Sequence, residues 1–302
     1  MTPTKSAVLA ALLLTACATS PKTEAPSPTI HTVTGSVKGI LANAYLVEGA
    51  TGVVAVDSAL TLTDAKEVRR RLDALGKPLL AVLVTHGHPD HYNGVAILVE
   101  GRPETPVYAA AAVARVIRDS DAAKEAQWKP VFGAEWPGER RFPERELSDG
   151  ESVVLDGYRW TLRSVGPGES HADAYWIFNA GGEKQAFIGD IVLHGVHAYV
   201  SDGHTGAWLR TLQRLESELS GFKTLFPGHG AAGDLALLGW QAGYLNTYRA
   251  EVERLRKGGG DLSETDTQSL AEIMRARYPG AGLEFLIALG ADAVASELAA
   301  GR

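Results

Sequence analysis

Three histidines and one aspartate lie within six residues of the segment LVTHGHPDHYNG, which spans residues 83–94. His86 and His88 are two positions apart at the end of an apolar run, so both side chains can point the same way. Asp90 and His91 follow one turn later and could face a second ion. A divalent metal such as zinc takes imidazole and carboxylate ligands, with one position open for water in a catalytic site. The segment alone predicts either part of a metal site or a polar loop with self-satisfied histidines.

Three later segments also place a ligand-type residue where an apolar run meets a loop. His171 follows the glycine-rich stretch GPGES, and His229 follows the short run LFPG. Asp190 ends the run AFIGD, where an unpaired carboxylate would be costly without a cation. Together with the first segment, these positions favour a metal site over a polar loop.

The segments that must position these residues alternate between strand-like and helix-like patterns. Residues 61–76 have apolar positions at helical spacing, with a threonine cap and a glycine stop. Residues 78–85 form a continuous apolar run, which is typical of a strand buried on both faces. A further helix is expected around 207–219, and helices dominate from residue 232 onward. The pattern predicts an α/β sandwich with helices outside two sheets, whose chemistry lies in loops at the strand ends.

Composition narrows the class of protein. The chain has 302 residues, of which 45% are hydrophobic and 22% are charged, enough for a sizeable core. Its formal net charge of -7 argues against a general nucleic-acid binder, because phosphate contacts need clustered lysine and arginine. No nucleic-acid partner is expected, and the small-molecule substrate that we do expect follows from the envelope location predicted below. The single cysteine, Cys17, excludes an intramolecular disulfide and offers no thiolate to a site in the body of the chain.

The N-terminus has the features of an export signal. Lys5 precedes an apolar run at 7–16 that is too short to span a bilayer stably but suits a signal-peptide core. The run ends in LTAC, which resembles the lipobox of bacterial lipoproteins. That resemblance implies cleavage before Cys17 and lipid modification of its thiol, and Ala18 resembles lipoproteins sent to the outer membrane, facing the periplasm. The alternative is an ordinary secretory signal with a chance cysteine.

This interpretation divides the chain into three parts. Residues 1–16 are expected to be a signal peptide, and 17–29 the lipidated cysteine with a flexible proline- and serine-containing tether. Residues 30–302 are expected to form a single domain. No other stretch of the sequence is long and apolar enough to cross a membrane.

The motifs THGHPDH, GESH, IGD and PGHG, in this order, resemble the metallo-β-lactamase superfamily. The resemblance covers about residues 33–240 and implies a four-layer αββα sandwich with a dinuclear metal site between the sheets, followed by a helical C-terminal extension. Asp57 matches an early aspartate that usually supports the ligands from behind. Carried over to this chain, the ligands of the first ion are His86, His88 and His171, those of the second are Asp90, His91 and His229, and Asp190 bridges them.

The implied chemistry is hydrolysis. Two close cations lower the pKa of a shared water from near 16 in bulk to roughly 7 for a zinc-bound water. The resulting bridging hydroxide would attack the carbonyl of a small ester, lactone, thioester or lactam, and a cation would stabilise the oxyanion. We expect two divalent ions, zinc first, with iron or manganese as alternatives that the same donors accept.

Other reactions on this fold stay open, because a fold does not fix a substrate. One class of β-lactamases has cysteine where this chain has Asp190, and the other dinuclear class typically lacks the aspartate, although β-lactam hydrolysis remains an alternative. An export signal argues against a glyoxalase II, and the acidic balance argues against a nuclease. An iron-dependent persulfide dioxygenase and a non-catalytic metal-binding lipoprotein are the remaining alternatives.

Catalytic roles are predicted for three residues. Asp90 lies within the metal motif, whereas His197 and Tyr199 lie in the segment after Asp190 and could donate a proton to a leaving group. Packing within that segment is the competing interpretation. Residues 127–142, with two tryptophans among proline and glycine, predict either a flap over the substrate or a loop pinned to the core.

Overall fold

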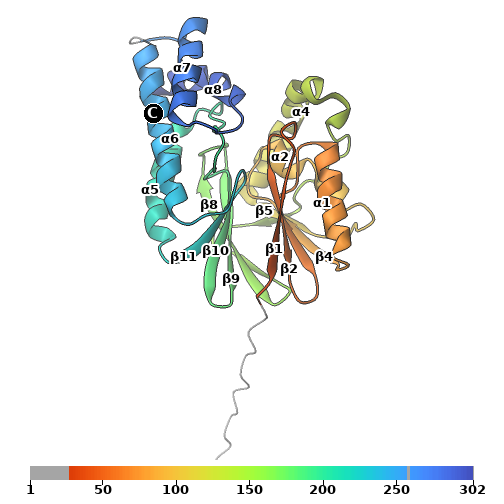
Figure 1. The fold of residues 1–302 in the computed structure, drawn as a ribbon. Helices are drawn as coiled ribbons and strands as arrows, with labels where there is room; N and C mark the ends of the chain where they lie inside the picture. Colours follow the sequence, from red (N-terminus) through yellow and green to blue (C-terminus); the bar gives the residue numbers. More distant parts are fainter. Residues whose placement is uncertain (1–26, 257–258, 302) are drawn as a thin grey trace, which may run out of the picture.

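The computed structural model of the protein describes residues 27–256 and 259–301. It shows two β-sheets packed face to face, with helices on both outer surfaces and further helices at the C-terminal end (Figure 1). The expected αββα sandwich with a helical extension is confirmed. The predicted signal peptide and the predicted lipidation site, Cys17, lie outside the described residues.

The first sheet has six strands in the order β1-β2-β3-β4-β5-β6. Pairing is antiparallel from β1 to β3 and parallel from β3 to β6. The strand expected within residues 78–85 is β4 at the middle of this sheet, and it is apolar throughout because helices cover one face and the second sheet the other. The strands are β1 (Thr29–Thr34), β2 (Asn43–Glu48), β3 (Val53–Val56), β4 (Leu79–Leu83), β5 (Val107–Ala110) and β6 (Arg145–Leu147).

The second sheet has five strands in the order β11-β10-β9-β8-β7. It is antiparallel except for the parallel pair β10 and β11. Aromatic rings from the two sheets meet between them, where Phe187 lies 5.2 Å from Tyr45 and 4.7 Å from Phe226 between ring centroids. The strands are β7 (Ser152–Leu155), β8 (Tyr158–Gly166), β9 (Asp173–Ala180), β10 (Glu183–Gly189) and β11 (Phe222–Pro227).

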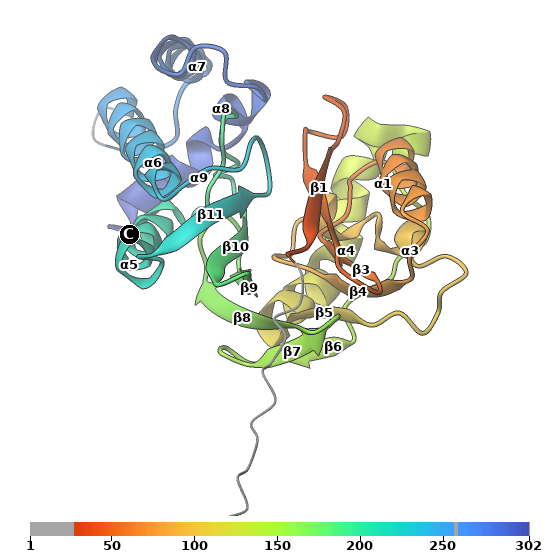
Figure 2. The ribbon, with the colours of Figure 1, turned by 60° about the horizontal axis from the view of Figure 1, so that its bottom comes forward.

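Helices form the outer layers, with α1, α3 and α4 outside the first sheet and α5, α6 and α9 outside the second (Figure 2). The helix expected within residues 61–76 is α1, and Thr61 is its cap because its hydroxyl accepts the backbone N–H of Asp64. Those beside the first sheet are α1 (Leu62–Ala74), α2 (Pro89–Tyr92), α3 (Val95–Leu98), α4 (Ala111–Phe132) and the 3₁₀ turn η1 (Gly133–Glu135). Those beside the second are α5 (Thr205–Glu218), α6 (Ala236–Leu255), α7 (Glu264–Arg277), α8 (Phe285–Leu289) and α9 (Ala291–Ala299).

The tryptophan-containing segment at 127–142 combines the two expected arrangements. Its first part is not a loop but the last turns of α4, which continue through Pro130. Trp128 is half-buried and lines a cavity, whereas Trp136 is buried against the body of the domain. The end of α4 therefore offers apolar contact area to the cavity, and the residues after α4 pack against the core.

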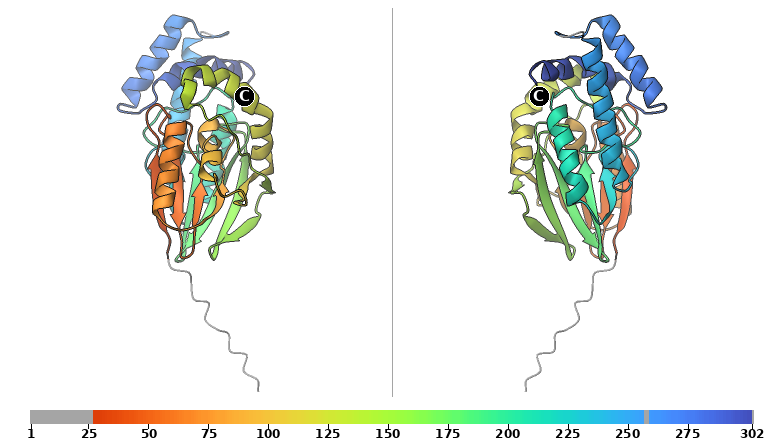
Figure 3. Two further views of the ribbon diagram at one scale, coloured as in Figure 1. Left: turned by 90° about the vertical axis from the view of Figure 1, so that its right-hand side faces the viewer. Right: turned by 90° about the vertical axis from the view of Figure 1, so that its left-hand side faces the viewer.

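The two ends of the sandwich differ. Helices α7 and α8 and the end of α4 gather at one end, and β1 begins at the opposite end (Figures 1 and 3). In the part of the chain that the structure describes, none of the helices has the length and apolar character needed to span a membrane.

A buried carboxylate joins the last helix to the second helical layer. Glu297 of α9 is 2% exposed and accepts hydrogen bonds from the backbone N–H of Thr205 at 3.0 Å and of Gly206 at 2.7 Å. Its carboxylate also lies 3.1 Å from the Arg249 guanidinium of α6. Glu297 thus satisfies N–H groups at the start of α5, which lack partners within that helix.

Replacing Glu297 with alanine is expected to destabilise the protein by about 3–5 kcal/mol, because it leaves a partly buried guanidinium and two buried N–H groups without this acceptor. Urea unfolding followed by circular dichroism measures the change. Glu216, exposed on α5, is the matched control, and its alanine variant should stay within about 0.5 kcal/mol of the parent. Equal stability of the two variants would contradict the proposed bracing role.

Candidate metal centre

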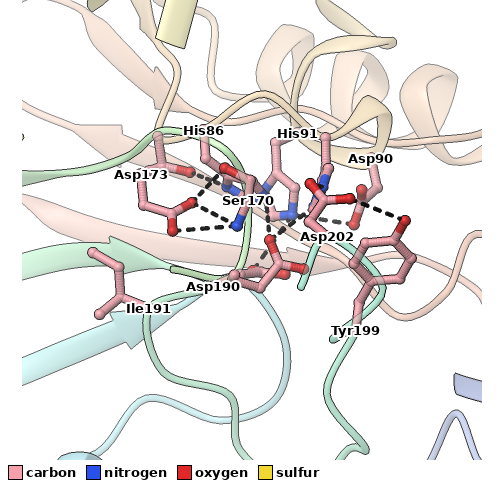
Figure 4. A network of polar contacts seen from close by, with 12 residues as sticks. His86, Asp90, His91, Ser170, Asp173, Asp190, Ile191, Tyr199 and Asp202 are labelled. Carbon is pink, nitrogen blue, oxygen red and sulfur yellow. Dashed lines mark hydrogen bonds and ion pairs between the residues drawn. The ribbon is translucent and has the colours of Figure 1, made fainter. Parts of the chain in front are cut away.

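The ligand-type residues come together at one edge of the two sheets. His86 and His88 follow the end of β4, and Asp190 and His229 follow the ends of β10 and β11. Because β4 belongs to one sheet and β10 and β11 to the other, the face-to-face packing of the sheets brings these loops together (Figure 4). The expected convergence of segments far apart in the sequence is therefore observed for these four residues.

One group contains two carboxylates and two imidazoles. Asp90, His91, Asp190 and His229 are all buried, and their ligand atoms lie within 4.8 Å of one another. The Nε2 atom of His229 is 3.1 Å from Asp90 Oδ2 and 3.2 Å from Asp190 Oδ2. Asp190 Oδ1 is 3.4 Å from His91 Nε2. These are the four residues that the sequence predicts for the second ion and the bridge.

The other group contains His86, His88 and Glu169, which are also buried and mutually within 4.8 Å. One oxygen of Glu169 lies 2.8 Å from His88 Nδ1 and 3.4 Å from His86 Nε2. Glu169 thus occupies the third position of this group, which the sequence resemblance assigned to a histidine two residues later.

His171 lies outside both groups, although the sequence resemblance assigned it to the ligands of the first ion. Its side chain is 55% exposed, and its Nδ1 atom is 2.7 Å from His204 Nε2. The physical reason is the bend between β8 and β9. The hydroxyl of Ser170 donates to the Asp173 carboxylate at 2.6 Å, and this anchored bend buries Glu169 while it leaves His171 at the surface.

Two positions beside the site require glycine. A Cβ atom at Gly228 would lie 1.8 Å from Asp190 Oδ1, so any side chain there would displace the carboxylate. Gly189 has a φ of +55°, and a Cβ atom there would lie 2.6 Å from the Thr85 hydroxyl. The left-handed conformation and the close approach both require glycine, so the IGD and PGHG motifs build the site with backbone as well as side chains.

Four hydrogen bonds link Asp57, Thr85 and the far sides of two imidazoles. The Asp57 carboxylate lies 2.9 Å from His91 Nδ1, and it accepts the backbone N–H and the hydroxyl of Thr85, both at 2.8 Å. The Thr85 hydroxyl is in turn 3.1 Å from His86 Nδ1. The expected supporting position of Asp57 is confirmed by these contacts, which fix ring orientation and leave each Nε2 atom facing the centre.

His88 has an equivalent support that the sequence analysis did not identify. Its Nδ1 atom faces Glu169, and its Nε2 atom is 3.2 Å from Asp202 Oδ2. The Lys124 ammonium lies 3.9 Å from the same carboxylate. Asp202 lies in the segment after Asp190 for which the sequence predicts roles of His197 and Tyr199.

Burial and mutual charge shift the pKa values across the site. Burial raises the pKa of Glu169 to about 8 against the opposing effect of His88, because a carboxylate with so little solvent favours its neutral form. Burial favours the neutral form of Asp90, but His91 and His229 favour its charged form more strongly. The pKa of Asp90 is therefore held well below its usual range. Burial favours the neutral form of His229, but the carboxylates of Asp190 and Asp90 favour its charged form more strongly. The pKa of His229 is therefore raised to about 10.

These groups fit a pair of divalent cations. Among the described residues, several buried polar atoms of the cluster have no hydrogen-bond partner, namely His86 Nε2, His91 Nε2, Glu169 Oε2 and Asp190 Oδ1. Buried polar atoms normally find partners, so a set of unpaired imidazole nitrogens and carboxylate oxygens at one point fits a cation-binding site. Imidazole with carboxylate is a donor set that zinc, iron and manganese all accept, so it does not select one metal.

A cavity of about 380 Å³ opens over the cluster, and five of the seven cluster residues line it. Tyr199 lines it with its ring 5.0 Å from the His88 ring, and its hydroxyl is 3.4 Å from Asp202 Oδ1. His197 also lines it, with Nδ1 3.1 Å from the Tyr244 hydroxyl. Both residues line the cavity, and their catalytic roles stay predictions.

Replacing Asp57 with asparagine is expected to weaken metal binding by about 10- to 100-fold, because the amide cannot accept from Thr85 and His91 as the carboxylate does. Asparagine tolerates the φ of +58° at this position, so the backbone should be retained. Competition with a chromophoric chelator measures affinity. Asp156 has a φ of +50° and binds the turn at Thr51, and Asp156→Asn should leave metal affinity unchanged. Similar losses in both variants would count against the supporting role of Asp57.

Known proteins share this fold and these motifs. The family model of the metallo-beta-lactamase superfamily matches residues 37–229. The atrochrysone carboxyl ACP thioesterase of Aspergillus novofumigatus is 28% identical over 247 residues, which cover 78% of this chain and 66% of that protein. The hydroxyacylglutathione hydrolase of Microcystis aeruginosa is 27% identical over 51% of this chain and 52% of that protein. The chain thus spans from about half to just under two thirds of these two relatives.

Solved structures agree with the sequence relatives. A metallo-beta-lactamase family protein from Thermus thermophilus superposes with a TM-score of 0.63 at 24% identity, over 90% of this chain and 93% of that one. At this identity the likeness concerns the fold. Because the family model matches more than half of the chain, and the sandwich and its converging ligand residues agree with that match, the chain belongs to the metallo-beta-lactamase superfamily.

Proposed function

We propose that the protein is a metal-dependent hydrolase of a small ester, lactone, thioester or lactam, with a dinuclear centre of divalent ions. The observation that carries this proposal is the convergence of seven buried histidine, aspartate and glutamate side chains beneath one cavity. Such a cavity admits a small molecule directly to the centre. The named relatives include a thioesterase and a hydroxyacylglutathione hydrolase, which supports hydrolysis at a carbonyl group.

When bound, two divalent ions would supply a water that ionises near neutral pH and a Lewis acid for the carbonyl oxygen. The residues of this chain would provide the geometry. Asp57 and Asp202 orient His91 and His88 through hydrogen bonds on the far side of each ring. Asp90 faces the cavity as a ligand and as the proposed catalytic carboxylate.

Tyr199 and His197, which line the cavity, are the candidates for protonation of the leaving group. Burial raises the pKa of the Tyr199 phenol, which therefore keeps its proton and can donate it. Burial lowers the pKa of His197, which therefore stays neutral, and its Nε2 atom has no hydrogen-bond partner among the described residues. We propose Tyr199 as the proton donor and His197 as a neutral hydrogen-bonding group beside it.

The decisive experiment combines metal analysis with an activity panel. The purified protein, loaded in turn with zinc, iron(II) and manganese(II), should bind two ions per chain and hydrolyse at least one class among esters, lactones, thioesters and β-lactams. Chelation should abolish the activity, and readdition of the metal should restore it. Two bound ions with no hydrolysis of any of the four classes would refute the proposed reaction.

One observation favours a second candidate, an iron-dependent oxidoreductase. His86, His88 and Glu169 form a set of two histidines and one carboxylate, which is the donor set of many non-haem iron(II) oxygenases. The second group of ligands then has no role in that reaction. Oxygen consumption by the iron-loaded protein with a persulfide, unaffected by His229→Ala, would favour this candidate over the hydrolase.

We propose that the protein is a lipoprotein of the bacterial envelope, anchored through Cys17 and facing the periplasm. β1 begins at the end of the sandwich opposite to α8 and the end of α4 (Figure 1), both of which line the cavity, so an anchor ahead of β1 need not block it. Cys17→Ser should move the protein from the membrane fraction to the soluble fraction of cells, with an unchanged circular dichroism spectrum. Retention of this variant in the membrane fraction would argue against the anchor.

A further inference from the structure

The cavity above the metal centre has an unusual division between floor and wall. Its floor is polar, because five ligand residues line it. Its wall is built largely from apolar side chains contributed by segments far apart in the sequence. These include Ile40, Leu60, Trp128, Phe132, Leu193 and Leu286. A substrate that reaches the floor must therefore lie against an apolar wall.

The rim of the cavity is apolar as well. Among the residues that the structure describes, five large apolar side chains are strongly exposed, and three of them line this cavity. These three are Val37 at 75% exposure, Val131 at 67% and Phe285 at 54%. They come from the loop after β1, the end of α4 and the C-terminal helix α8. Exposed apolar groups that gather at one opening mark a binding site for an apolar partner.

Among the described residues that line the wall, none provides a free cation deep in the cavity. The Lys124 ammonium is 3.9 Å from the Asp202 carboxylate and 5.4 Å from the centre of the Tyr199 ring, so it is already engaged. Lys38 lines the cavity but is exposed at its mouth. The Nε2 atom of His197 has no hydrogen-bond partner in the part of the chain described. The wall thus suits an apolar group that carries at most one polar atom.

We propose that this cavity selects substrates in which the scissile carbonyl carries a large apolar acyl group, either an aliphatic chain or an aromatic ring. This inference rests on the proposed hydrolase and names its substrate class. The carbonyl would lie over the metal centre, and the apolar group would extend along Trp128 and Phe132 toward Val131 and Phe285. Helix α8 lies outside the residues that the family model matches, so this chain's own C-terminal extension supplies part of the selectivity.

The kinetic test compares acetyl and octanoyl thioesters of N-acetylcysteamine, which share a leaving group and differ only in the acyl chain. The metal-loaded protein should prefer the octanoyl ester by about 100-fold in kcat/KM, since each buried methylene adds to binding. Val131→Ser and Phe285→Ser should each reduce this preference several-fold, because each lowers kcat/KM for the octanoyl ester more than for the acetyl ester. Both positions are exposed, so both variants should fold. Val154→Ser, at a position 62% exposed on β7 and away from the cavity, is the matched control and should keep the full preference.

A binding measurement separates this inference from the proposed reaction. Octanamide is a poor substrate and should bind the metal-loaded protein at least tenfold more tightly than acetamide in calorimetry, and Val131→Ser should reduce that difference. If octanamide binds in this way but no ester is hydrolysed, the reaction is wrong and the apolar site stands. Equal affinity for the two amides, or hydrolysis without any chain-length preference, would overturn the inference.

Discussion

Asp190→Ala should bind metal more than 100-fold more weakly than the parent protein and lose hydrolytic activity to at least the same extent. The reason is that Asp190 reaches both His91 at 3.4 Å and His229 at 3.2 Å, so its loss opens the middle of the centre. Removing a supporting residue behind a ligand typically costs 10- to 100-fold, and a ligand should cost more. Metal content after exhaustive dialysis and kcat/KM on the best substrate measure the two effects.

Two companion variants sharpen this prediction. Asp119 is exposed on α4, and Asp119→Ala should leave both metal content and activity unchanged. Asp190→Cys places a soft thiolate at the same point, so it should recover zinc binding in preference to manganese. An Asp190→Ala protein that kept two tightly held ions would show that the carboxylate is not a ligand, and the dinuclear assignment would fail with it.

Local signals in the sequence were sufficient for much of the fold. The apolar periodicity and the threonine cap that predicted a helix at 61–76 act within the helix itself, and α1 forms there with Thr61 as its cap. The continuous apolar run at 78–85 predicted a doubly covered strand, and β4 lies at the middle of its sheet. The sequence pattern predicted secondary structure less well where the structure depends on tertiary contacts. The end of α4 runs through Pro130, in a segment that read as a loop because proline and glycine are frequent there.

The ligands were predictable where a strand end dictates the side-chain direction. Asp190 and His229 directly follow strands of a buried sheet, so their direction is set by the sheet and by the glycines beside them. Residues 167–172 form a bend instead, and its shape depends on the bond between Ser170 and Asp173. Residue type alone favoured the histidine of GESH, although the glutamate in the same motif is also a ligand type. The support from Asp202 depends on a contact across 114 residues, which one sequence does not reveal.

Glu169→Ala should strip the ion held by His86 and His88, with a loss of affinity above 100-fold, whereas His171→Ala should change affinity by less than about twofold. Glu169 is 2% exposed and 2.8 Å from His88 Nδ1, but His171 is exposed and bonded to His204. Loss of a residue that supports a ligand from behind typically lowers metal affinity 10- to 100-fold, and His171 forms no hydrogen bond with His86 or His88. Metal content per chain and titration with cobalt(II), whose absorption spectrum reports the ligands, measure both variants. Loss of the ion in His171→Ala instead would restore the assignment that the sequence motif suggests.

Glu169→His tests what the carboxylate contributes, and the structure predicts a change of metal preference rather than a loss of metal. With Glu169 the two groups hold three carboxylates and four imidazoles, which is a harder and more anionic donor set than one with a histidine in its place. Zinc favours nitrogen donors more than manganese does, so Glu169→His should raise the ratio of zinc to manganese retained from an equimolar mixture. The cause would be the donor atom, because the surrounding bend is held by Ser170 and Asp173 and not by the side chain at 169. An unchanged ratio in a variant that still binds two ions would mean that Glu169 lies beside the first ion without coordinating it.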